Sequence, residues 1–358
     1  MPIVAYSDLP SYGRLREEGQ EILSRERAET QDIRTIHIGI LNMMQDSALE
    51  ATERQFIRLI GNSDRITQLR IHLFNIEGIE RGSEARAHIE RYYTPFEEIR
   101  AHGLDGLILT GTNVSQPDIT QEPFWEPFCE VLDWAQGHVT SVLCSCLATH
   151  AVVRQIYGIE RSPMGAKLWG VYPHRATMPD HPLMQSVNTR FFVPHSRYNE
   201  ITRAQLEEAG AMIVAESKEA GVHMATSADG FRFVFFQGHP EYDTHSLLKE
   251  YKREVLRFTD REREDYPPFP ENYFSLQSRA ILDEYREKLA CGEAGTPFPE
   301  VLMMERLDNS WRDTSKAIVN NWIGRVYQTT NVDLSKQFMD GIDPDDPLGL
   351  HANASAKV

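Results

Sequence analysis

A buried strand that runs directly into a helix constrains this fold most, and it lies in residues 138–157, HVTSVLCSCLATHAVVRQIY. Residues 139–142 form a β-branched run typical of a buried strand, and from Leu147 onward apolar residues recur at helical spacing. Cys146 lies between them. A side chain at such a turn is held at the carboxyl edge of a sheet, where the N–H groups of the following helix favour a thiolate. The position suits a nucleophile, although a cysteine considered alone is more often an inert buried residue.

Strands and helices alternate along the first half of the chain. The patterning predicts strands over residues 35–41, 69–74, 106–110 and 139–142, separated by amphipathic helices. This order predicts an α/β fold with a mostly parallel sheet, helices on both faces and an active edge at the carboxyl ends of the strands. After Ile159, short strands with turn signals between them predict antiparallel additions to the sheet.

Composition excludes several classes of protein. The chain has 358 residues and a net charge of −16, which argues against nucleic-acid binding and against binding to acidic membranes. No segment approaches the ~20 uninterrupted apolar residues of a membrane span, and residues 1–20 lack the pattern of a secretory signal. Four cysteines in a chain of this length form no disulfide framework, so the cytosol is the expected compartment.

A histidine and a glutamate follow the most apolar predicted strand, residues 231–236. Because that strand belongs to the core, His239 and Glu241 are expected at the same sheet edge as Cys146. Cysteine–histidine catalysis requires an imidazole that takes the thiol proton and a third group that orients the ring. Glu241 can fold back to His239 because Pro240 favours a turn. A turn held by hydrogen bonds would explain the same spacing, but the shared edge favours catalysis.

Metal and nucleotide sites are not expected. Cys144 and Cys146 have no second Cys or Cys/His pair at zinc spacing, and Cys144 falls where the strand should be buried. Gly111 lies in no dinucleotide-binding glycine motif, and the sequence contains no P-loop. We therefore expect a site without metal.

Local motifs resemble those of a known family. The order Cys146, His239, Glu241 on an α/β scaffold resembles the class I glutamine amidotransferase fold. The strings PHSRY at residues 194–198 and GHPEYD at residues 238–243 are more specific, and they resemble the homoserine O-acyltransferase (homoserine transsuccinylase) family. Further similar strings are LNMM at 41–44, ERQFIRLI at 53–60, DGLILTG at 105–111, KLxGVY at 167–172, NW at 321–322 and VYQT at 326–329.

The resemblance also implies a division of the chain. It covers residues 32–334, with an insertion at about residues 275–300, and implies one acyltransferase domain there. Residues 1–31, which are polar and mixed in charge, are then an N-terminal arm, and residues 335–358 a C-terminal tail. A homodimer is implied as well.

The activity implied by the resemblance is ping-pong transfer of an acyl group to L-homoserine, the first committed step of methionine biosynthesis. Cys146 would attack the thioester of an acyl-CoA and hold the acyl group. His239, oriented by Glu241, would be the general base for the thiol and then for the γ-hydroxyl of homoserine. Succinyl-CoA or acetyl-CoA is a co-substrate, and no permanently bound cofactor is implied. An oxyanion hole is expected from backbone N–H groups at Leu147 and at Gly111 or Thr112.

The expected substrate contacts also follow from the resemblance. Homoserine is a zwitterion, so its pocket needs a cation for the carboxylate and acceptors for the ammonium group. The contacts of the family fall on Lys167, Ser196 and Arg253. Without the resemblance, the two cations would be solvated surface charges and Ser196 a turn hydroxyl.

The identity of the acyl donor is expected to depend on Ser115, where relatives carry Gly or Glu. A small Ser leaves room for a succinyl chain, whereas a Glu would fill that space and repel the succinyl carboxylate, so succinyl-CoA is favoured. The loop after Leu41 lacks the Pro and Lys residues common there, has two extra positions and contains the acidic Asp46, which counts against succinyl-CoA and leaves acetyl-CoA as the alternative donor. Serine, one methylene shorter than homoserine, is an alternative acceptor, because a methylene changes binding by only ~1–3 kcal/mol.

Two other functions are compatible with the same three residues. A glutaminase-type amidohydrolase would use them, but it normally delivers ammonia to a synthetase, and the sequence shows no synthetase domain. A non-catalytic binding protein of this fold would be expected to lose one of the three, and all three are present.

Overall fold

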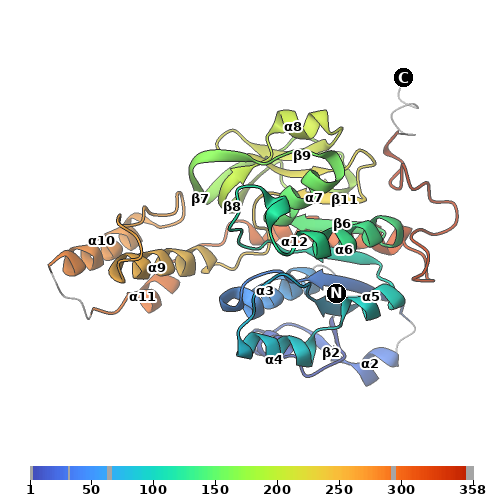
Figure 1. Ribbon diagram of the computed structural model, residues 1–358, viewed down its shortest axis with the longest axis horizontal. Helices are drawn as coiled ribbons and strands as arrows, with labels where there is room; N and C mark the ends of the chain where they lie inside the picture. Colours follow the sequence, from blue (N-terminus) through green and yellow to red (C-terminus); the bar gives the residue numbers. More distant parts are fainter. Residues whose placement is uncertain (1–2, 31–32, 63–66, 292–295, 352–358) are drawn as a thin grey trace.

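The computed structural model describes residues 3–30, 33–62, 67–291 and 296–351. Within these residues, one mixed sheet has the strand order β2-β1-β4-β3-β5-β6-β11-β10-β9-β7-β8 (Figure 1). The strands are β1 (Ile3–Ala5), β2 (Ile22–Ser24), β3 (Thr35–Leu41), β4 (Gln68–Phe74), β5 (Gly106–Leu109), β6 (Ser141–Ser145), β7 (Ser162–Ala176), β8 (Arg190–Glu200), β9 (Met212–Ser217), β10 (Gly221–Thr226) and β11 (Phe233–Phe236).

The helices of the described residues differ widely in length and position. They are α1 (Pro10–Glu17), α2 (Arg25–Glu29), α3 (Leu49–Gly61), α4 (Ser83–Tyr92), α5 (Phe96–His102), α6 (Trp125–His138), α7 (Leu147–Tyr157), α8 (Arg203–Glu208), α9 (Ser246–Thr259), α10 (Leu276–Ala290), α11 (Glu300–Met304) and α12 (Arg312–Thr329). None of these helices combines the length and the apolar character needed to cross a bilayer.

The sheet has a parallel half and an antiparallel half. Strands β4, β3, β5, β6 and β11 are parallel neighbours, while β11, β10, β9, β7 and β8 pair antiparallel. Every residue of β5, β6 and β11 is buried, as expected for parallel strands covered on both faces. The predicted fold class, a mostly parallel sheet with antiparallel additions, is confirmed.

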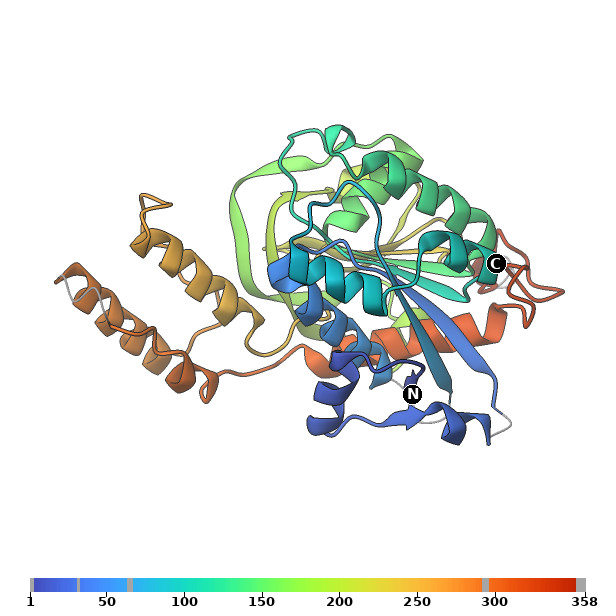
Figure 2. The ribbon, with the colours of Figure 1, turned by 60° about the horizontal axis from the view of Figure 1, so that its bottom comes forward.

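Two apolar cores lie on opposite faces of the sheet (Figure 1, Figure 2). One core joins alternate residues of β3 and β4 to α1, α3 and α12. The other core joins Leu107 and Leu109 of β5 to α5, α6 and α7, while Ile108 between them belongs to the first core. Because successive strand residues point to opposite faces, one apolar strand supplies both cores. This layering holds the carboxyl ends of β3, β5, β6 and β11 at one edge.

The N-terminal segment differs from the arm that the sequence predicts. β1 pairs with both β2 and β4, so residues 3–24 extend the edge of the sheet. Tyr12 and Leu15 of α1 are buried in the core that α3 and α12 also line. Strands β1 and β2 have three residues each and charged neighbours. They are too short to show an alternation of apolar and polar residues, so the sequence does not predict them.

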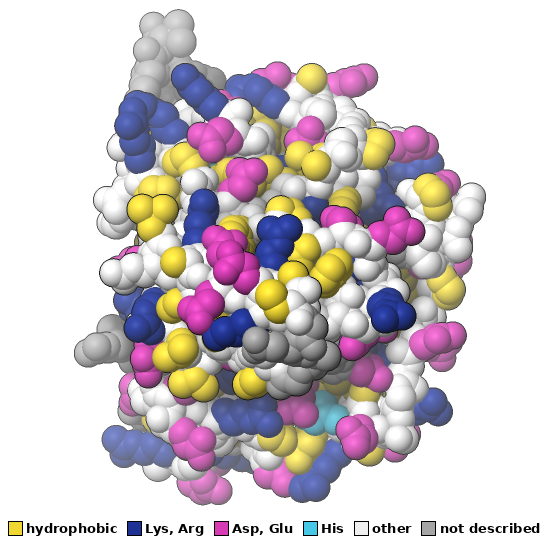
Figure 3. Space-filling model, turned by 90° about the vertical axis from the view of Figure 1, so that its left-hand side faces the viewer, with side chains coloured by type: hydrophobic (Ala, Val, Ile, Leu, Met, Phe, Trp, Pro, Cys, Tyr) yellow, Lys and Arg dark blue, Asp and Glu magenta, His cyan; other side chains and the backbone are white. Residues whose placement is uncertain are grey.

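Helices α9, α10 and α11 form a unit that projects from the sheet (Figure 1). This helical unit has its own apolar core, which includes Tyr251, Leu282 and Trp311. Its α10 lies inside the segment predicted as an insertion. Figure 3 shows apolar and charged side chains mixed over this side of the molecule, and Leu276 and Val301 there are 85% and 72% exposed.

The C-terminal tail lies against the end of the sheet opposite the carboxyl edge of β6. Thr140, which precedes β6, donates a hydrogen bond of 2.6 Å from Oγ1 to the carbonyl oxygen of Gln337. Thr330 and Phe338 form an isolated antiparallel bridge. The last seven residues of the predicted tail, 352–358, lie outside the described residues. The bounds expected for the acyltransferase domain and for the tail stay predictions.

Candidate active site

Cys146 occupies a strained turn between β6 and α7. Its φ of 51° and ψ of −112° are unusual for a residue other than glycine, and such conformations cost about 1–3 kcal/mol. The backbone N–H of Cys146 donates to the carbonyl oxygen of Phe236 at 2.8 Å, which fixes the turn to the end of β11. Cys144 is fully buried, and burial raises the pKa of its thiol, whereas Cys146 is partly exposed. The turn therefore presents the thiol of Cys146 at the carboxyl edge of the sheet.

His239 lies between Cys146 and a carboxylate. Its Nδ1 is 2.7 Å from Oε1 of Glu241, so Nδ1–H donates to Glu241 and Nε2 is left for the thiol. Burial alone would lower the pKa of His239, but the charges of Cys146 and Glu241 and hydrogen bonds to both hold that pKa well above its usual value. The ring of Tyr242 stacks on His239 with centroids 4.1 Å apart. Ser145 Oγ lies 3.5 Å from both carboxylate oxygens of Glu241.

The turn that carries His239 requires a glycine before it. A β-carbon on Gly238 would lie 2.6 Å from Cγ1 of Val193 and 2.9 Å from the ring of His195, distances that side chains do not reach. Without that β-carbon, the N–H of His239 reaches the carbonyl oxygen of Pro194 at 2.9 Å. Close contact with β8 thus sets the position of the imidazole.

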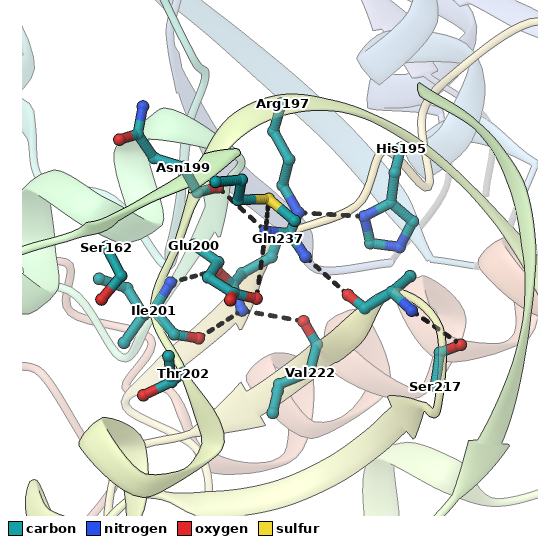
Figure 4. A network of polar contacts seen from close by, with 12 residues as sticks. Ser162, His195, Arg197, Asn199, Glu200, Ile201, Thr202, Ser217, Val222 and Gln237 are labelled. Atoms are coloured by element: carbon teal, nitrogen blue, oxygen red, sulfur yellow. Dashed lines mark hydrogen bonds and ion pairs between the residues drawn. The ribbon is translucent and has the colours of Figure 1, made fainter. Parts of the chain in front are cut away.

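A buried amide holds the end of β11 in place (Figure 4). Nε2 of Gln237 donates to the carbonyl oxygens of Ile201 and Val222, each at 2.9 Å. Its Oε1 accepts the N–H of Ile201 at 2.7 Å. Because Gln237 is two residues before His239, this network fixes the strand end from which the imidazole projects.

Arg197 is a buried cation near the thiol. In Figure 4 its side chain runs toward His195, and its Nη2 donates to the carbonyl oxygen of Ala220 at 2.6 Å. Burial lowers the pKa of Arg197, and the charges of Glu200 and Cys146 oppose that shift. A guanidinium stays charged in proteins, so Arg197 favours a thiolate at Cys146.

Two of the three positions expected for the oxyanion hole, Gly111 and Leu147, lie close together beside Cys146. A β-carbon built on Gly111 would lie 3.6 Å from Cβ of Cys146 and from the backbone nitrogen of Leu147. Leu147 begins α7, so its N–H has no acceptor within the helix and points to the helix N-terminus. Thr112 follows in the same loop and is half-buried. Their role as donors stays a prediction.

A second carboxylate lies beside the histidine. Glu250 of α9 accepts hydrogen bonds from Lys167 at 3.1 Å, Ser196 at 2.6 Å and Tyr242 at 2.7 Å. Burial alone would raise the pKa of Glu250, but the charge of Lys167 and the hydrogen bonds from Ser196 and Tyr242 lower it. Since Tyr242 stacks on His239, this ionised carboxylate lies next to the reacting groups.

The structure brings together two of the three expected substrate contacts. Lys167 and Ser196 meet at Glu250, whereas Arg253, three residues later on the same helix, has a side chain that is 59% exposed. Its guanidinium lies 3.6 Å from Glu254, so the ion pair there is weak and solvated. Arg253 thus lies at the rim of the site, on the same side of α9 as Glu250.

Comparison with a family profile shows to which family this chain belongs. The profile described as "Homoserine O-succinyltransferase" matches residues 2–332. The chain belongs to that family. The predicted family and the predicted enzyme class, an acyltransferase, are confirmed.

The sequence similarity to members of this family extends over almost the whole length of both chains. The chain is 59% identical to the homoserine O-succinyltransferase of Methylococcus capsulatus, over 98% of this chain and 100% of the relative. It is also 59% identical to the enzyme of that name from Allochromatium vinosum, over 98% and 99% of the two chains. A solved glutamine amidotransferase from Thermotoga maritima aligns with 84% of this chain and 100% of its own at 12% identity, with a TM-score of 0.43.

In this member of the family, the position expected to distinguish acyl donors is held by a buried acid. Ser115 donates to Glu122 through its backbone N–H and, at 3.3 Å, through Oγ, and the N–H of Gln116 donates to the same carboxylate at 2.6 Å. The acidic Asp46 is 3.2 Å from Arg81 and accepts the N–H of Gly82 at 2.7 Å. The carboxylates of Glu122 and Asp46 thus both accept hydrogen bonds from neighbouring groups.

Sequence reasoning missed three side chains of this site: Glu250, Tyr242 and Arg197. A signal existed for Glu250, because the pocket for a zwitterion needs an acceptor, and Glu250 lies one turn before Arg253 in a predicted helix. Tyr242 and Arg197 lie inside the motifs GHPEYD and PHSRY, but no spacing rule indicates which side they face.

Proposed function

We propose that this enzyme transfers a succinyl group from succinyl-CoA to the hydroxyl of L-homoserine through a thioester on Cys146, as the first committed step of methionine biosynthesis. The observation that carries the proposal is the position of His239, which interacts with Cys146 on one side and with Glu241 on the other. The relatives that are 59% identical are homoserine O-succinyltransferases, which supports the donor and the acceptor.

Acylation of the enzyme comes first. The thiolate of Cys146 attacks the carbonyl carbon of succinyl-CoA, and N–H groups at Leu147 and Gly111 or Thr112 stabilise the oxyanion. The carbon–sulfur bond to CoA then breaks, and the CoA thiolate takes the proton held by His239. The exchange of one thioester for another is close to isoenergetic. The raised pKa of His239 therefore adds little to the free energy of this step.

Transfer to the acceptor follows. Nε2 of His239, now neutral, takes the proton of the γ-hydroxyl of homoserine while the oxygen attacks the acyl-Cys146 carbon. The bond to the sulfur of Cys146 breaks, and O-succinylhomoserine leaves. Glu241 keeps the ring oriented through both half-reactions and stabilises the imidazolium that forms in each.

The acceptor pocket follows from the cluster at Glu250. The carboxylate of Glu250 suits the ammonium group of homoserine, and Arg253 at the rim suits its carboxylate. Lys167 and Ser196 hold Glu250 ionised and in position. Cytosolic location and a homodimer accompany this proposal as predictions.

Assays with different donors and acceptors test the proposal. We expect transfer from succinyl-CoA to homoserine at a kcat/KM well above that for acetyl-CoA, and above that for serine as acceptor. Without acceptor, the enzyme should exchange labelled CoA into succinyl-CoA, since acylation is reversible. Turnover with acetyl-CoA alone would overturn the donor, preference for serine would overturn the acceptor, and release of ammonia from glutamine without CoA exchange would indicate a glutaminase.

A further inference from the structure

Three histidines converge away from the active site, between β3, β4 and the last residue of α5. Nδ1 of His37 is 3.0 Å from Nε2 of His72 and 2.8 Å from Nε2 of His102. One ring nitrogen from each residue lies within 4.8 Å of the other two. His72 is buried, His37 is half-buried and His102 is exposed, so the cluster is open to solvent on one side.

Hydrogen bonding alone does not satisfy this arrangement. A ring nitrogen has one direction in the ring plane, which holds either a proton or a lone pair. Nδ1 of His37 faces two ring nitrogens at hydrogen-bonding distance, so it can bond well to only one of them. A cation placed among three lone pairs satisfies all three nitrogens at once. Zn²⁺ bonded to nitrogen at about 2.0–2.1 Å in tetrahedral geometry needs nitrogens about 3.3 Å apart. The two pairs that include Nδ1 of His37 would move apart by a few tenths of an ångström, and the nitrogens of His72 and His102, which lie within 4.8 Å of each other, would move closer together.

The protonation state of the cluster suits a metal. Burial, followed by the neighbouring histidine of the cluster and then Arg70, lowers the pKa of His37 to about 3 and that of His72 to about 2, and burial also lowers the pKa of His102. Neutral imidazole is the form that binds metal ions. Arg70 opposes a cation here, but its guanidinium lies 4.2 Å from the centre of the Tyr6 ring.

We propose that His37, His72 and His102 bind one first-row divalent ion, Zn²⁺ or a close relative, which joins the end of α5 to strands β3 and β4. Three imidazoles with an open fourth position fit this class of ion, for which affinity is set by ligand type and geometry. His37 precedes the carboxyl end of β3 by four residues, about 13 Å along the strand, so the ion is separate from the reacting groups. The histidines are 35 and 30 positions apart, which matches no metal motif and explains why the sequence predicts no metal.

Zinc uptake by the full chain tests the proposal. After incubation with ZnCl₂ and exhaustive dialysis, we expect one zinc per chain by elemental analysis, and a Tm that rises with the logarithm of free zinc concentration. His102→Asn should weaken zinc binding by at least about tenfold, because even changes outside the ligand shell cost about 10–100-fold. His102 is exposed, so this variant should fold and keep its kcat. With Co²⁺ as the probe, wild type should show the visible absorption of a tetrahedral site and the variant should not.

Two controls separate this site from others. His138→Asn replaces an exposed histidine that is also the last residue of its helix, α6, and it should bind zinc as wild type does. Cys146→Ser removes the thiol of the active site and should also keep the zinc. Zinc lost in Cys146→Ser but kept in His102→Asn would overturn the proposal, as would the absence of stoichiometric zinc in wild type.

Discussion

The proposed catalytic residues and the proposed acceptor-binding residues lie side by side but are held in place in different ways. Cys146, His239 and Glu241 lie at the ends of two neighbouring parallel strands, and backbone geometry places them: a positive φ at the cysteine and a close contact at Gly238. The cluster at Glu250 instead joins β7, β8 and α9 through side-chain hydrogen bonds. Backbone contacts at two strand ends fix the first group and side-chain hydrogen bonds fix the second, so changes in the second should alter acceptor binding and leave acylation intact.

The largest effect is expected from loss of the nucleophile. Cys146→Ala should lower kcat/KM for transfer by about 10⁴-fold or more, because removal of a nucleophile eliminates the covalent route. Steady-state kinetics with succinyl-CoA and homoserine measure this loss. Cys144→Ala is the matched control: its thiol is fully buried in the same strand, so the variant should lower Tm and keep kcat within a few-fold. Equal losses in the two variants would contradict the assignment of Cys146.

A smaller but still large effect is expected from the orienting carboxylate. Glu241→Gln should lower kcat by about 10²–10⁴-fold, because the imidazolium loses its partner. The charge of Glu241 helps to raise the pKa of His239, so its removal lowers that pKa. Acylation requires protonated His239 to give a proton to CoA, and the alkaline limb of its pH profile should therefore move to lower pH. If the alkaline limb of the pH profile of CoA exchange stays at the same pH in this variant, Glu241 does not set the pKa of His239.

Glu250→Gln tests most sharply whether acceptor binding and acylation depend on different residues. It should raise KM for homoserine by about 10–100-fold, since a charged hydrogen bond of about 1.5–3 kcal/mol is lost, and leave CoA exchange close to wild type. Glu300→Gln is the control, because Glu300 of α11 pairs with Lys252 on α9 and not with the cluster at Glu250. A parallel loss of CoA exchange in Glu250→Gln would mean that the two groups act as one.

The smallest effect is expected at the donor loop. Ser115→Glu should shift the ratio of kcat/KM for succinyl-CoA to that for acetyl-CoA toward acetyl-CoA by at least about tenfold, through size and charge repulsion. Asn113→Glu, which adds the same charge two residues earlier in the loop, should change the ratio less. If both variants change the ratio equally, the effect is one of net charge, and Ser115 is not the discriminating position.

Much of the parallel half could be predicted from the sequence, and less of the antiparallel half. The strands that lead to Cys146 and His239 are short runs rich in β-branched or aromatic residues with turns at their ends, and such runs can be recognised in the sequence. β7, with 15 residues, contains Pro163, Gly165, Gly170 and Pro173 and a register irregularity, so it does not read as a strand. Partners that depend on this strand, such as Lys167 with Glu250, cannot be inferred without the fold.

The most direct measurement is the intact mass of the enzyme after mixing with succinyl-CoA in the absence of homoserine. The proposed mechanism predicts a mass gain of one succinyl group on a peptide that contains Cys146, discharged by homoserine and absent in Cys146→Ser. The gain should persist in Glu250→Gln, in which only the discharge is slowed. A wild-type enzyme that turns over succinyl-CoA and homoserine without any acyl adduct, or with the adduct on another residue, would contradict the central role of Cys146.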